Sequence, residues 1–534
     1  MYTKQDWIKY FPFQTPRLDQ EIAINDALTS LWPKNGQKAH RFWLANLPTG
    51  IGKSAIAITI ARWLNDKMAE KTHLLTTQKI LQEQYIKDFG SNYISNIFGR
   101  NQYVCNESKK EVSCEQSAEE KRLFGIKPCE KCPYTIARSE WVESEIGLAN
   151  FAFFLSYSQT NNQSVNSLPR ELIIVDEAHN LENILTSFST VVINADYATS
   201  MGFSKDSFWN LSDTKLRSWI VEEYYPKLVS HSSNYHKQIK QLDPQKVNKQ
   251  LIETLKALDE YITSLSTFVE LWNVVEWHHA KIDNIGIITI KPLTAHGLAE
   301  RFLFKYGKKI ICMSGTLLEG NQFASQLGIP MTETKWLSMP SPFHKDNRKV
   351  FAIYDQSLNV SYKNYDENVD ELCKKISNII NEIHPNESGI IHVGSYKLAN
   401  DILTKVRSPR ILLHDSNNRM EIYNKHITSS KNTILLSPSM TEGVDLKDDL
   451  SRFQIIAKLP YPSLGDAWIR SKMKRVKGWY EWHTIASLIQ ASGRSIRNEN
   501  DWCITYILDP SFKSIYNRKI GLFPKWWKEG LEWI

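Results

Sequence analysis

Short apolar runs alternate with helix-forming runs along most of this chain of 534 residues. Apolar runs at 42–45, 73–77 and 172–175 each end in small, hydroxyl-bearing or acidic residues. The alternation returns beyond residue 350, where 389–395 and 433–438 read as strands. Strands that are apolar throughout and alternate with helices are typical of parallel sheets covered on both faces. We therefore expect two α/β domains in tandem.

Two stretches depart from this alternation. Residues 196–285 are predicted to be helical, because apolar side chains recur there in steps of four and three, as in the seam between two packed helices. This pattern fits a helical arch or hairpin, or ordinary packing within a bundle. Residues 135–148 are also predicted to be helical, and an aromatic-rich segment follows at 150–158. The sequence Met-Pro-Ser-Pro at 339–342 predicts a linker between the two α/β domains.

A candidate phosphate-binding loop follows the first strand, where residues 47–54 read LPTGIGKS. Backbone N–H groups converge where such a turn enters a helix, and the helix dipole favours an anion there. Gly50 and Gly52 allow the backbone to approach a phosphate closely, Lys53 is expected to reach the β- and γ-phosphates, and Ser54 a Mg²⁺ ion. Leu47 stands where the motif usually has its first glycine. The alternative interpretation is a chance glycine-rich turn.

Two carboxylates end the apolar run at 172–175, since the sequence continues with Asp176 and Glu177. The C-terminal end of a buried parallel strand is where an NTPase needs them. We expect Asp176 to hold Mg²⁺ and Glu177 to polarise the attacking water. We expect His179 to respond to whether the terminal phosphate is present. Ser314, at the end of another predicted strand, is expected to connect the two carboxylates to a second domain. The alternative is a buried strand with charged residues at its end.

A basic helix is predicted near the C-terminus, at 488–497, with the sequence LIQASGRSIR. Spacings of four and three place Gln490, Arg494 and Arg497 on one face of that helix. Presented across a cleft to the phosphate-binding loop, the two arginines would stabilise transition-state charge. Taken alone, the segment would be a solvated basic face.

Composition adds little to this interpretation. The net charge of +7 is only a weak indication of a polyanionic partner, and most of the 17 Trp and 22 Tyr are expected to be core residues. The N-terminus lacks the apolar segment of a signal peptide, and no apolar stretch of about 18 residues exists. We expect a cytoplasmic or nucleoid-associated protein that is neither secreted nor inserted in a membrane.

Four of the seven cysteines fall close together, at Cys105, Cys114, Cys129 and Cys132. Disulfides are disfavoured in a reducing compartment, so metal ligation is the leading interpretation. Four thiolates suit either structural zinc or an iron–sulfur cluster, and the spacing does not separate the two. Four free thiols are the alternative.

Taken together, LPTGIGKS, VDEAH, MSGTL, TEGVDL and QASGRSIR occur in the order of superfamily 2 helicase motifs. With four cysteines between the first two motifs, the chain resembles the XPD/DinG family of iron–sulfur DNA helicases. The resemblance implies two RecA-like domains, with a cluster domain and a helical arch inserted in the first. It implies ATP-driven 5′-to-3′ unwinding of DNA from a single-stranded tail.

The resemblance also assigns residues. It implies that ATP and Mg²⁺ are bound by Arg17, Gln20, Thr49, Gly50, Gly52, Lys53, Ser54, Asp176, Gly443 and Asp445. It implies that catalysis uses Lys53, Asp176, Glu177, His179, Gln490, Arg494 and Arg497. It makes Cys105, Cys114, Cys129 and Cys132 the ligands of a [4Fe–4S] cluster. Without it, Arg17 and Gln20 would be read as surface residues that could lie near a bound adenine.

The expected domains follow from the motif order. The first motor domain is expected to comprise 1–98, 148–195 and 286–340, with the cluster insert at 99–147, the arch at 196–285 and the second motor domain at 341–534. Expected partners are single-stranded DNA, forked duplex DNA and loading or repair proteins, with no membrane. Two other functions remain open, an RNA helicase with a structural zinc site and an ATP-binding scaffold without unwinding activity.

Overall fold

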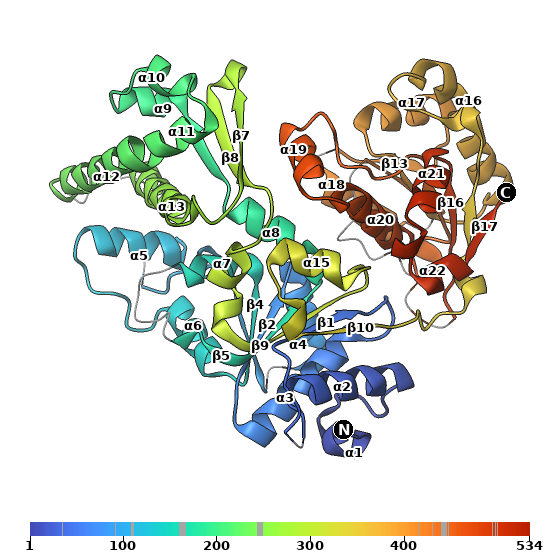
Figure 1. Cartoon of the computed structure of the whole chain (residues 1–534), viewed down its shortest axis with the longest axis horizontal. Helices are drawn as coiled ribbons and strands as arrows, with labels where there is room; N and C mark the ends of the chain where they lie inside the picture. The colour runs from blue at the N-terminus through green and yellow to red at the C-terminus, as the bar shows by residue number, and fades with distance from the viewer. Residues whose placement is uncertain are drawn as a thin grey trace.

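A computed structural model of the chain describes residues 1–34, 36–90, 92–107, 112–159, 167–242, 249–415, 417–429, 431–438, 446, 448–493, 495, 496, 498 and 500–534. Two seven-stranded sheets, parallel throughout, form its two α/β domains (Figure 1). Both predicted domains are therefore present. Among the described residues, no helix is both long enough and apolar enough to cross a membrane.

The first sheet has the strand order β10-β1-β9-β5-β2-β4-β3. Its strands are β1 (Phe42–Asn46), β2 (Thr72–Thr76), β3 (Ile94–Ile97), β4 (Ile146–Asn150), β5 (Arg170–Asp176), β9 (Gly307–Ser314) and β10 (Thr334–Ser338). Alternate residues of β1 enter different core clusters, Phe42 and Leu44 one and Trp43 and Ala45 the other, because successive side chains point to opposite faces. The sheet is thus covered on both faces, as its apolar strands predict.

The helices of this domain are α1 (Lys4–Trp7), α2 (Leu18–Leu31), α3 (Lys53–Met68), α4 (Lys79–Phe89), α7 (Phe151–Ser158), α8 (Leu181–Phe188), α14 (Leu298–Phe302) and α15 (Gly320–Leu327). The predicted strands near 42, 73 and 172 are confirmed as β1, β2 and β5. The helix predicted at 135–148 is wrong at its end, because residues from Ile146 onward form β4. Gly147 is required in β4, since a Cβ there would lie 2.9 Å from Trp141 Nε1 and 3.0 Å from Arg170.

The cysteine-bearing insert lies between β3 and β4 and contains α5 (Cys114–Leu123) and α6 (Pro133–Glu143). A second insert lies between α8 and α14. It combines helices with a three-stranded antiparallel sheet of order β6-β8-β7, formed by β6 (Val191–Asn194), β7 (Trp277–Ile282) and β8 (Ile287–Pro292). The all-helical interpretation of 196–285 is therefore wrong for β7.

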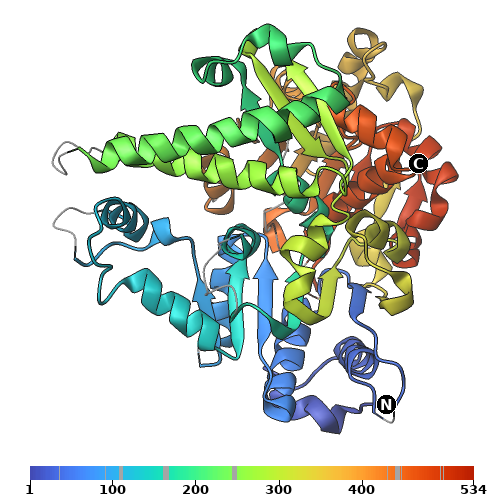
Figure 2. The ribbon, with the colours of Figure 1, turned by 60° about the vertical axis from the view of Figure 1, so that its left-hand side comes forward.

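The helices of the second insert are α9 (Ala195–Ser200), α10 (Lys205–Trp209), α11 (Asp213–Trp219), α12 (Tyr225–Lys240) and α13 (Lys249–Leu271). Figure 2 shows α12 and α13 as a long hairpin that extends over the cysteine insert. Leu123 of α5 packs against Ile239 and Leu255 of the hairpin, and Arg122 donates to Asp259 at 2.9 Å. The two inserts therefore contact each other.

The second domain follows the linker as one uninterrupted segment. Its sheet has the order β13-β14-β12-β15-β16-β11-β17, formed by β11 (Val350–Ala352), β12 (Gly389–His392), β13 (Ile411–Leu413), β14 (Ile434–Ser437), β15 (Phe453–Ile456), β16 (Ile504–Ile507) and β17 (Leu531–Trp533). Its helices are α16 (Tyr365–Asn378), α17 (Tyr396–Val406), α18 (Arg419–Ile427), α19 (Ala467–Arg475), α20 (Trp479–Ser492), α21 (Ser511–Arg518) and α22 (Lys525–Glu529). The predicted strands near 389 and 433 are confirmed as β12 and β14.

The two domains contact each other through α19 and α20. Lys472 of α19 donates to Glu182 of α8 at 2.6 Å, and the Lys472 side chain is only 1% exposed. Trp468 donates its indole N–H to the carbonyl oxygen of Pro292 at 2.9 Å, which ties α19 to β8 of the second insert. This interface holds α19 of the second domain against the first domain and its second insert.

Candidate active site

The loop of residues 47–52 connects β1 to α3, and its glycines have the geometry of a phosphate-binding loop. Gly50 and Gly52 have φ values of 90° and 86°, which favour glycine. A Cβ on Gly50 would lie 2.1 Å from the ring of Phe343, and one on Gly52 would lie 2.4 Å from Gln20 Nε2. Lys53 begins α3 directly after the loop. Phe343 and Gln20 thus pack directly against the glycines of this loop, which lies at the positive end of a 16-residue helix, where an anion is favoured.

Arg17 and Gln20 lie beside this loop. Gln20, in the first turn of α2, donates from Nε2 to the carbonyl oxygen of Ile51 at 2.9 Å, and its Oε1 accepts the N–H of Arg17 at 2.9 Å. The guanidinium of Arg17 comes within 3.2 Å of the position that a Cβ on Gly52 would take. Both side chains therefore line the approach to the phosphate-binding loop.

Two carboxylates lie across from Lys53. The Lys53 ammonium is 3.5 Å from Glu177 Oε1. Asp176 ends β5 and is buried, and its Oδ1 accepts the N–H of Glu177 at 3.0 Å. Burial, together with the charge of Glu177, raises the pKa of Asp176 to about 6. A cation bound beside Asp176 would offset that cost, and carboxylate and hydroxyl oxygens are the ligands that Mg²⁺ prefers.

Tyr85 joins this group, although sequence analysis missed it. Its hydroxyl donates to Asp176 Oδ2 at 2.8 Å and lies near the Ser54 side chain. Tyr85 lies on α4, a helix without a recognisable motif, so only the fold brings it to the end of β5. Its contact with Asp176 spans 91 residues of sequence.

His179 connects the carboxylates to the second domain. Its Nδ1 lies 2.7 Å from Ser314 Oγ and 3.3 Å from Glu177 Oε2, and its Nε2 lies 3.1 Å from Gln490 Nε2. Because an amide nitrogen can only donate, Nε2 of His179 is the acceptor and the ring proton is on Nδ1. The predicted relay of Ser314 thus has a direct contact with His179, and Gln490 reaches it from across the cleft.

The predicted helix at 488–497 is shorter in the structure, because α20 ends at Ser492. The prediction of one helix through residue 497 is therefore wrong, because the described residues 495 and 496 are not helical. Glycine is a poor helix former, so Gly493 directly after Ser492 favours the end of a helix at this point. Arg494 and Arg497 themselves lie outside the described residues, as do Gly443 and Asp445.

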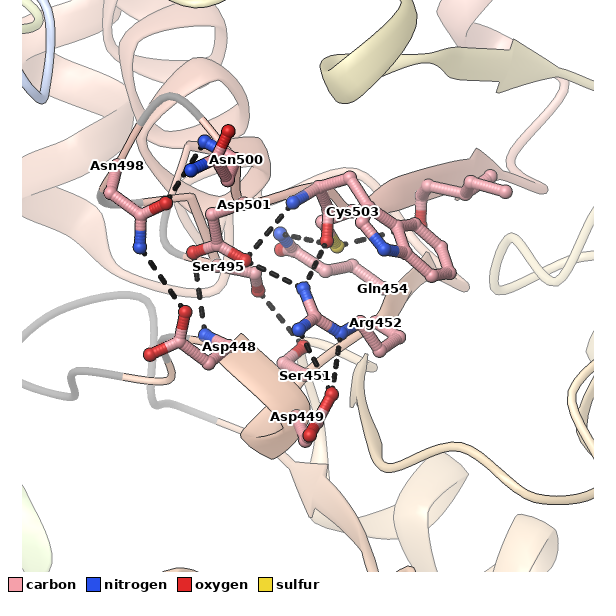
Figure 3. Close-up of polar contacts among 12 residues, drawn as sticks. Asp448, Asp449, Ser451, Arg452, Gln454, Ser495, Asn498, Asn500, Asp501 and Cys503 are labelled. Carbon is pink, nitrogen blue, oxygen red and sulfur yellow. Dashed lines mark hydrogen bonds and ion pairs between the residues drawn. The ribbon is translucent and has the colours of Figure 1, made fainter.

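A polar network holds the described residues around that segment (Figure 3). Arg452 donates from NH1 to Asp501 Oδ1 at 2.6 Å, and Asp501 is 1% exposed. Ser495 Oγ donates to Ser451 Oγ at 2.9 Å. These contacts join the start of β15 to the chain that follows α20.

A cavity of about 590 Å³ lies between the two domains. The first domain contributes Thr49, Lys53, Glu177 and His179, among others, and the second contributes Gln490 and other residues. This cavity brings residues of the candidate phosphate-binding loop, Lys53 and the Glu177 carboxylate to one place, and the buried Asp176 directly precedes Glu177. Such a set of groups can hold a nucleoside triphosphate with Mg²⁺ and direct a water at its terminal phosphate.

The four cysteines of the insert form close contacts in pairs. Cys105 Sγ lies 3.8 Å from Cys129 Sγ, and Cys114 contacts Cys132. The Lys121 ammonium donates to Cys129 Sγ at 3.0 Å. Within the described part of the chain, no group of three or more Cys, His, Asp and Glu side chains is arranged to hold a metal ion. The donor set suits thiolate ligation, while the identity of a bound group stays a prediction.

Comparison with known proteins matches both halves of the chain. Residues 376–530 match the helicase C-terminal domain family, and residues 14–204 match the family of the res subunit of type III restriction enzymes. The ATP-dependent DNA helicase DinG of Photobacterium profundum is 23% identical over 74% of this chain and 70% of its own. The ATP-dependent DNA helicase XPD of Sulfolobus acidocaldarius is 22% identical over 73% of each chain.

A solved structure of an XPD helicase has a TM-score of 0.60 at 16% identity, covering 98% of this chain and 100% of the other. That likeness shows the fold, and the two parallel sheets described above fit two RecA-like domains.

Proposed function

Because this chain belongs to the XPD/DinG-like superfamily 2 helicases, we propose that it hydrolyses ATP to move 5′ to 3′ along single-stranded DNA and unwind forked duplexes. The observation that carries the proposal is the cavity between the domains. It is lined by Lys53 and Glu177 of one domain and by Gln490 of the other, so that a nucleotide bound there contacts both.

We assign the nucleotide phosphates to the loop with Thr49, Gly50, Gly52 and Lys53, because this loop lies at the N-terminus of α3 and Thr49 and Lys53 line the cavity. Ser54 and Asp176 would hold Mg²⁺, which supplies a positive charge to the phosphate oxygens. Arg17 and Gln20 lie close enough to the loop to contact the adenine.

Glu177 orients the attacking water in this proposal. Its carboxylate faces the Lys53 ammonium at 3.5 Å. A triphosphate offers Lys53 a stronger anionic partner, which releases Glu177 for the water. Its other oxygen faces His179 at 3.3 Å, and His179 in turn contacts Gln490. Through these contacts, loss of the terminal phosphate would change the position of Gln490 in the second domain.

The second domain completes the site. Arg494 and Arg497 would stabilise the negative charge of the transition state, and Gly443 and Asp445 would contact the nucleotide or Mg²⁺ from the neighbouring loop. These four assignments rest on the motif order. The polar network supports the two arginine assignments, since it holds Ser495, between the arginines, and Asp501, after them, against the start of β15.

The cysteine insert is proposed to carry a [4Fe–4S] cluster on Cys105, Cys114, Cys129 and Cys132. The four thiols gather in one insert, and the Lys121 ammonium donates to one of them. A cluster would fix the loops of this insert, whose α5 packs against the α12–α13 hairpin. We propose a cytoplasmic or nucleoid-associated enzyme, with loading or repair proteins as further partners.

Unwinding of tailed duplexes by the purified chain tests the proposal. We expect ATPase activity stimulated by single-stranded DNA, and unwinding of a 5′-tailed duplex in preference to a 3′-tailed one. Stimulation by RNA rather than DNA would replace the proposal with an RNA helicase. ATP binding without turnover would replace it with a scaffold.

A further inference from the structure

The hydroxyl of Tyr85 contacts one of the two side chains proposed to hold Mg²⁺ and lies near the other. It donates to Asp176 Oδ2 at 2.8 Å, and Ser54 is its neighbour. The other carboxylate oxygen, Asp176 Oδ1, accepts the N–H of Glu177 at 3.0 Å. Both oxygens of Asp176 are therefore held, which fixes the plane of the carboxylate.

The position of this hydroxyl is set by the core rather than by solvent. Tyr85 is 3% exposed, and its ring packs against Phe89 of the same helix at 5.7 Å between centroids. The ring belongs to the apolar cluster that contains Ile56 and Ile58 of α3. Because these contacts restrict the side chain, the phenol oxygen is presented at one fixed place, at the end of β5.

The chemistry of a phenol suits this place. Near neutral pH it is an uncharged donor, so it orients a carboxylate without neutralising it. A lysine or arginine there would compete with a bound cation for the charge of Asp176. Lys53 instead faces Glu177, which leaves Asp176 with a neutral partner.

We infer that Tyr85 is a positioning residue for the Mg²⁺–nucleotide site, holding the Asp176 carboxylate beside Ser54 in the orientation that the ion requires. This inference rests on the proposed function, since it adds Tyr85 to the residues of the same Mg²⁺–nucleotide site. Hydrogen-bond partners of metal ligands typically change metal affinity by about 10–100-fold when they are removed.

The variant Tyr85→Phe removes only the hydroxyl and keeps the packed ring. We expect the MgCl₂ concentration for half-maximal binding of a fluorescent ADP analogue to rise about tenfold. Binding of the same analogue in excess EDTA is expected to stay unchanged. The matched control is Tyr365→Phe, which removes a 2.6 Å phenol–carboxylate hydrogen bond to Asp401 in the second domain.

A double-mutant cycle shows whether Tyr85 acts through the proposed ligands. If it does, Tyr85→Phe has a smaller effect in a Ser54→Ala background than in the wild type. The inference is overturned if Tyr85→Phe leaves the Mg²⁺ dependence unchanged, weakens metal-free binding equally, or lowers the midpoint of thermal unfolding enough to explain the loss. A wild-type protein without Mg²⁺-dependent nucleotide binding would instead overturn the proposed function itself.

Discussion

Gln490 of the second domain donates a hydrogen bond to His179 of the first, with 3.1 Å between the two Nε2 atoms. His179 also contacts Ser314 and Glu177, so one imidazole connects the carboxylate proposed to orient water with the opposite side of the cleft. His179 thus links the proposed catalytic carboxylate of the first domain to a helix of the second domain.

Gln490→Ala should weaken the coupling between the two domains. Because a net hydrogen bond contributes about 0.5–1.5 kcal/mol, we expect DNA-stimulated ATPase to fall about three- to tenfold. Unwinding should fall further, since each turnover then moves the domains less reliably. ATPase and unwinding measured side by side check this, with His483→Ala on the exposed face of the same helix as the control. An unchanged ratio of base pairs unwound to ATP hydrolysed would show that the contact has no part in coupling.

Lys53→Ala should abolish hydrolysis and unwinding while DNA binding survives. The change removes the cation that would contact the β- and γ-phosphates, and a loss of a hundredfold or more in ATPase, on the order of that for a lost transition-state donor, is expected. Turnover assays and binding of a labelled single strand measure the two properties separately. Undiminished hydrolysis would exclude the loop of residues 47–54 from the active site.

Lys472→Met should lower stability, because it leaves Glu182 buried without its partner. Removing one member of a buried ion pair typically costs about 3–5 kcal/mol, and adding Glu182→Gln should recover part of it. Denaturant unfolding monitors the change. Lys374→Met is the control, since its partner Glu371 and Lys374 itself are both exposed and such pairs contribute about 0–1 kcal/mol. Equal effects of the two substitutions would contradict the assignment of Lys472 as a buried interface residue.

The cysteine insert should give a brown protein when it is purified without oxygen. Iron and sulfide analysis together with visible absorption measures the cluster, and Cys129→Ser should abolish both. Cys373→Ser, a buried cysteine of the second domain, should leave them unchanged. A colourless preparation with one zinc ion per chain would replace the iron–sulfur assignment.

Local patterns were enough to predict the strands that carry the site. The apolar run of β1 ends at a glycine-rich turn, and that of β5 ends at two carboxylates. In each case the motif supported the prediction of a strand before it. β4 was missed because its short run holds Gly147 and Ala149, which give a weak strand signal. The position of Gly147 is explained only by Trp141 and Arg170, which the fold brings against it.

Long-range contacts could not be read from the sequence. Tyr85 carries no motif, and its contact with Asp176 depends on the neighbouring places of β2 and β5 in the sheet. Gln490 was correctly placed on a helix, but the helix was extended too far because the spacing of the arginines suggested a common face. A periodic pattern gives no information on where a helix stops unless a residue such as Gly493 is given weight.

The order of strands in the first sheet constrains how this protein can be made. β1 lies between β9 and β10, so Phe42 is paired with Ile310 and Thr334, which leave the ribosome long after it. The strand before the candidate phosphate-binding loop therefore gains both neighbouring strands only when more than half of the chain has been translated. Until then its buried strand lacks both neighbours and is exposed to misassociation, which makes early synthesis the period when this enzyme most needs a chaperone.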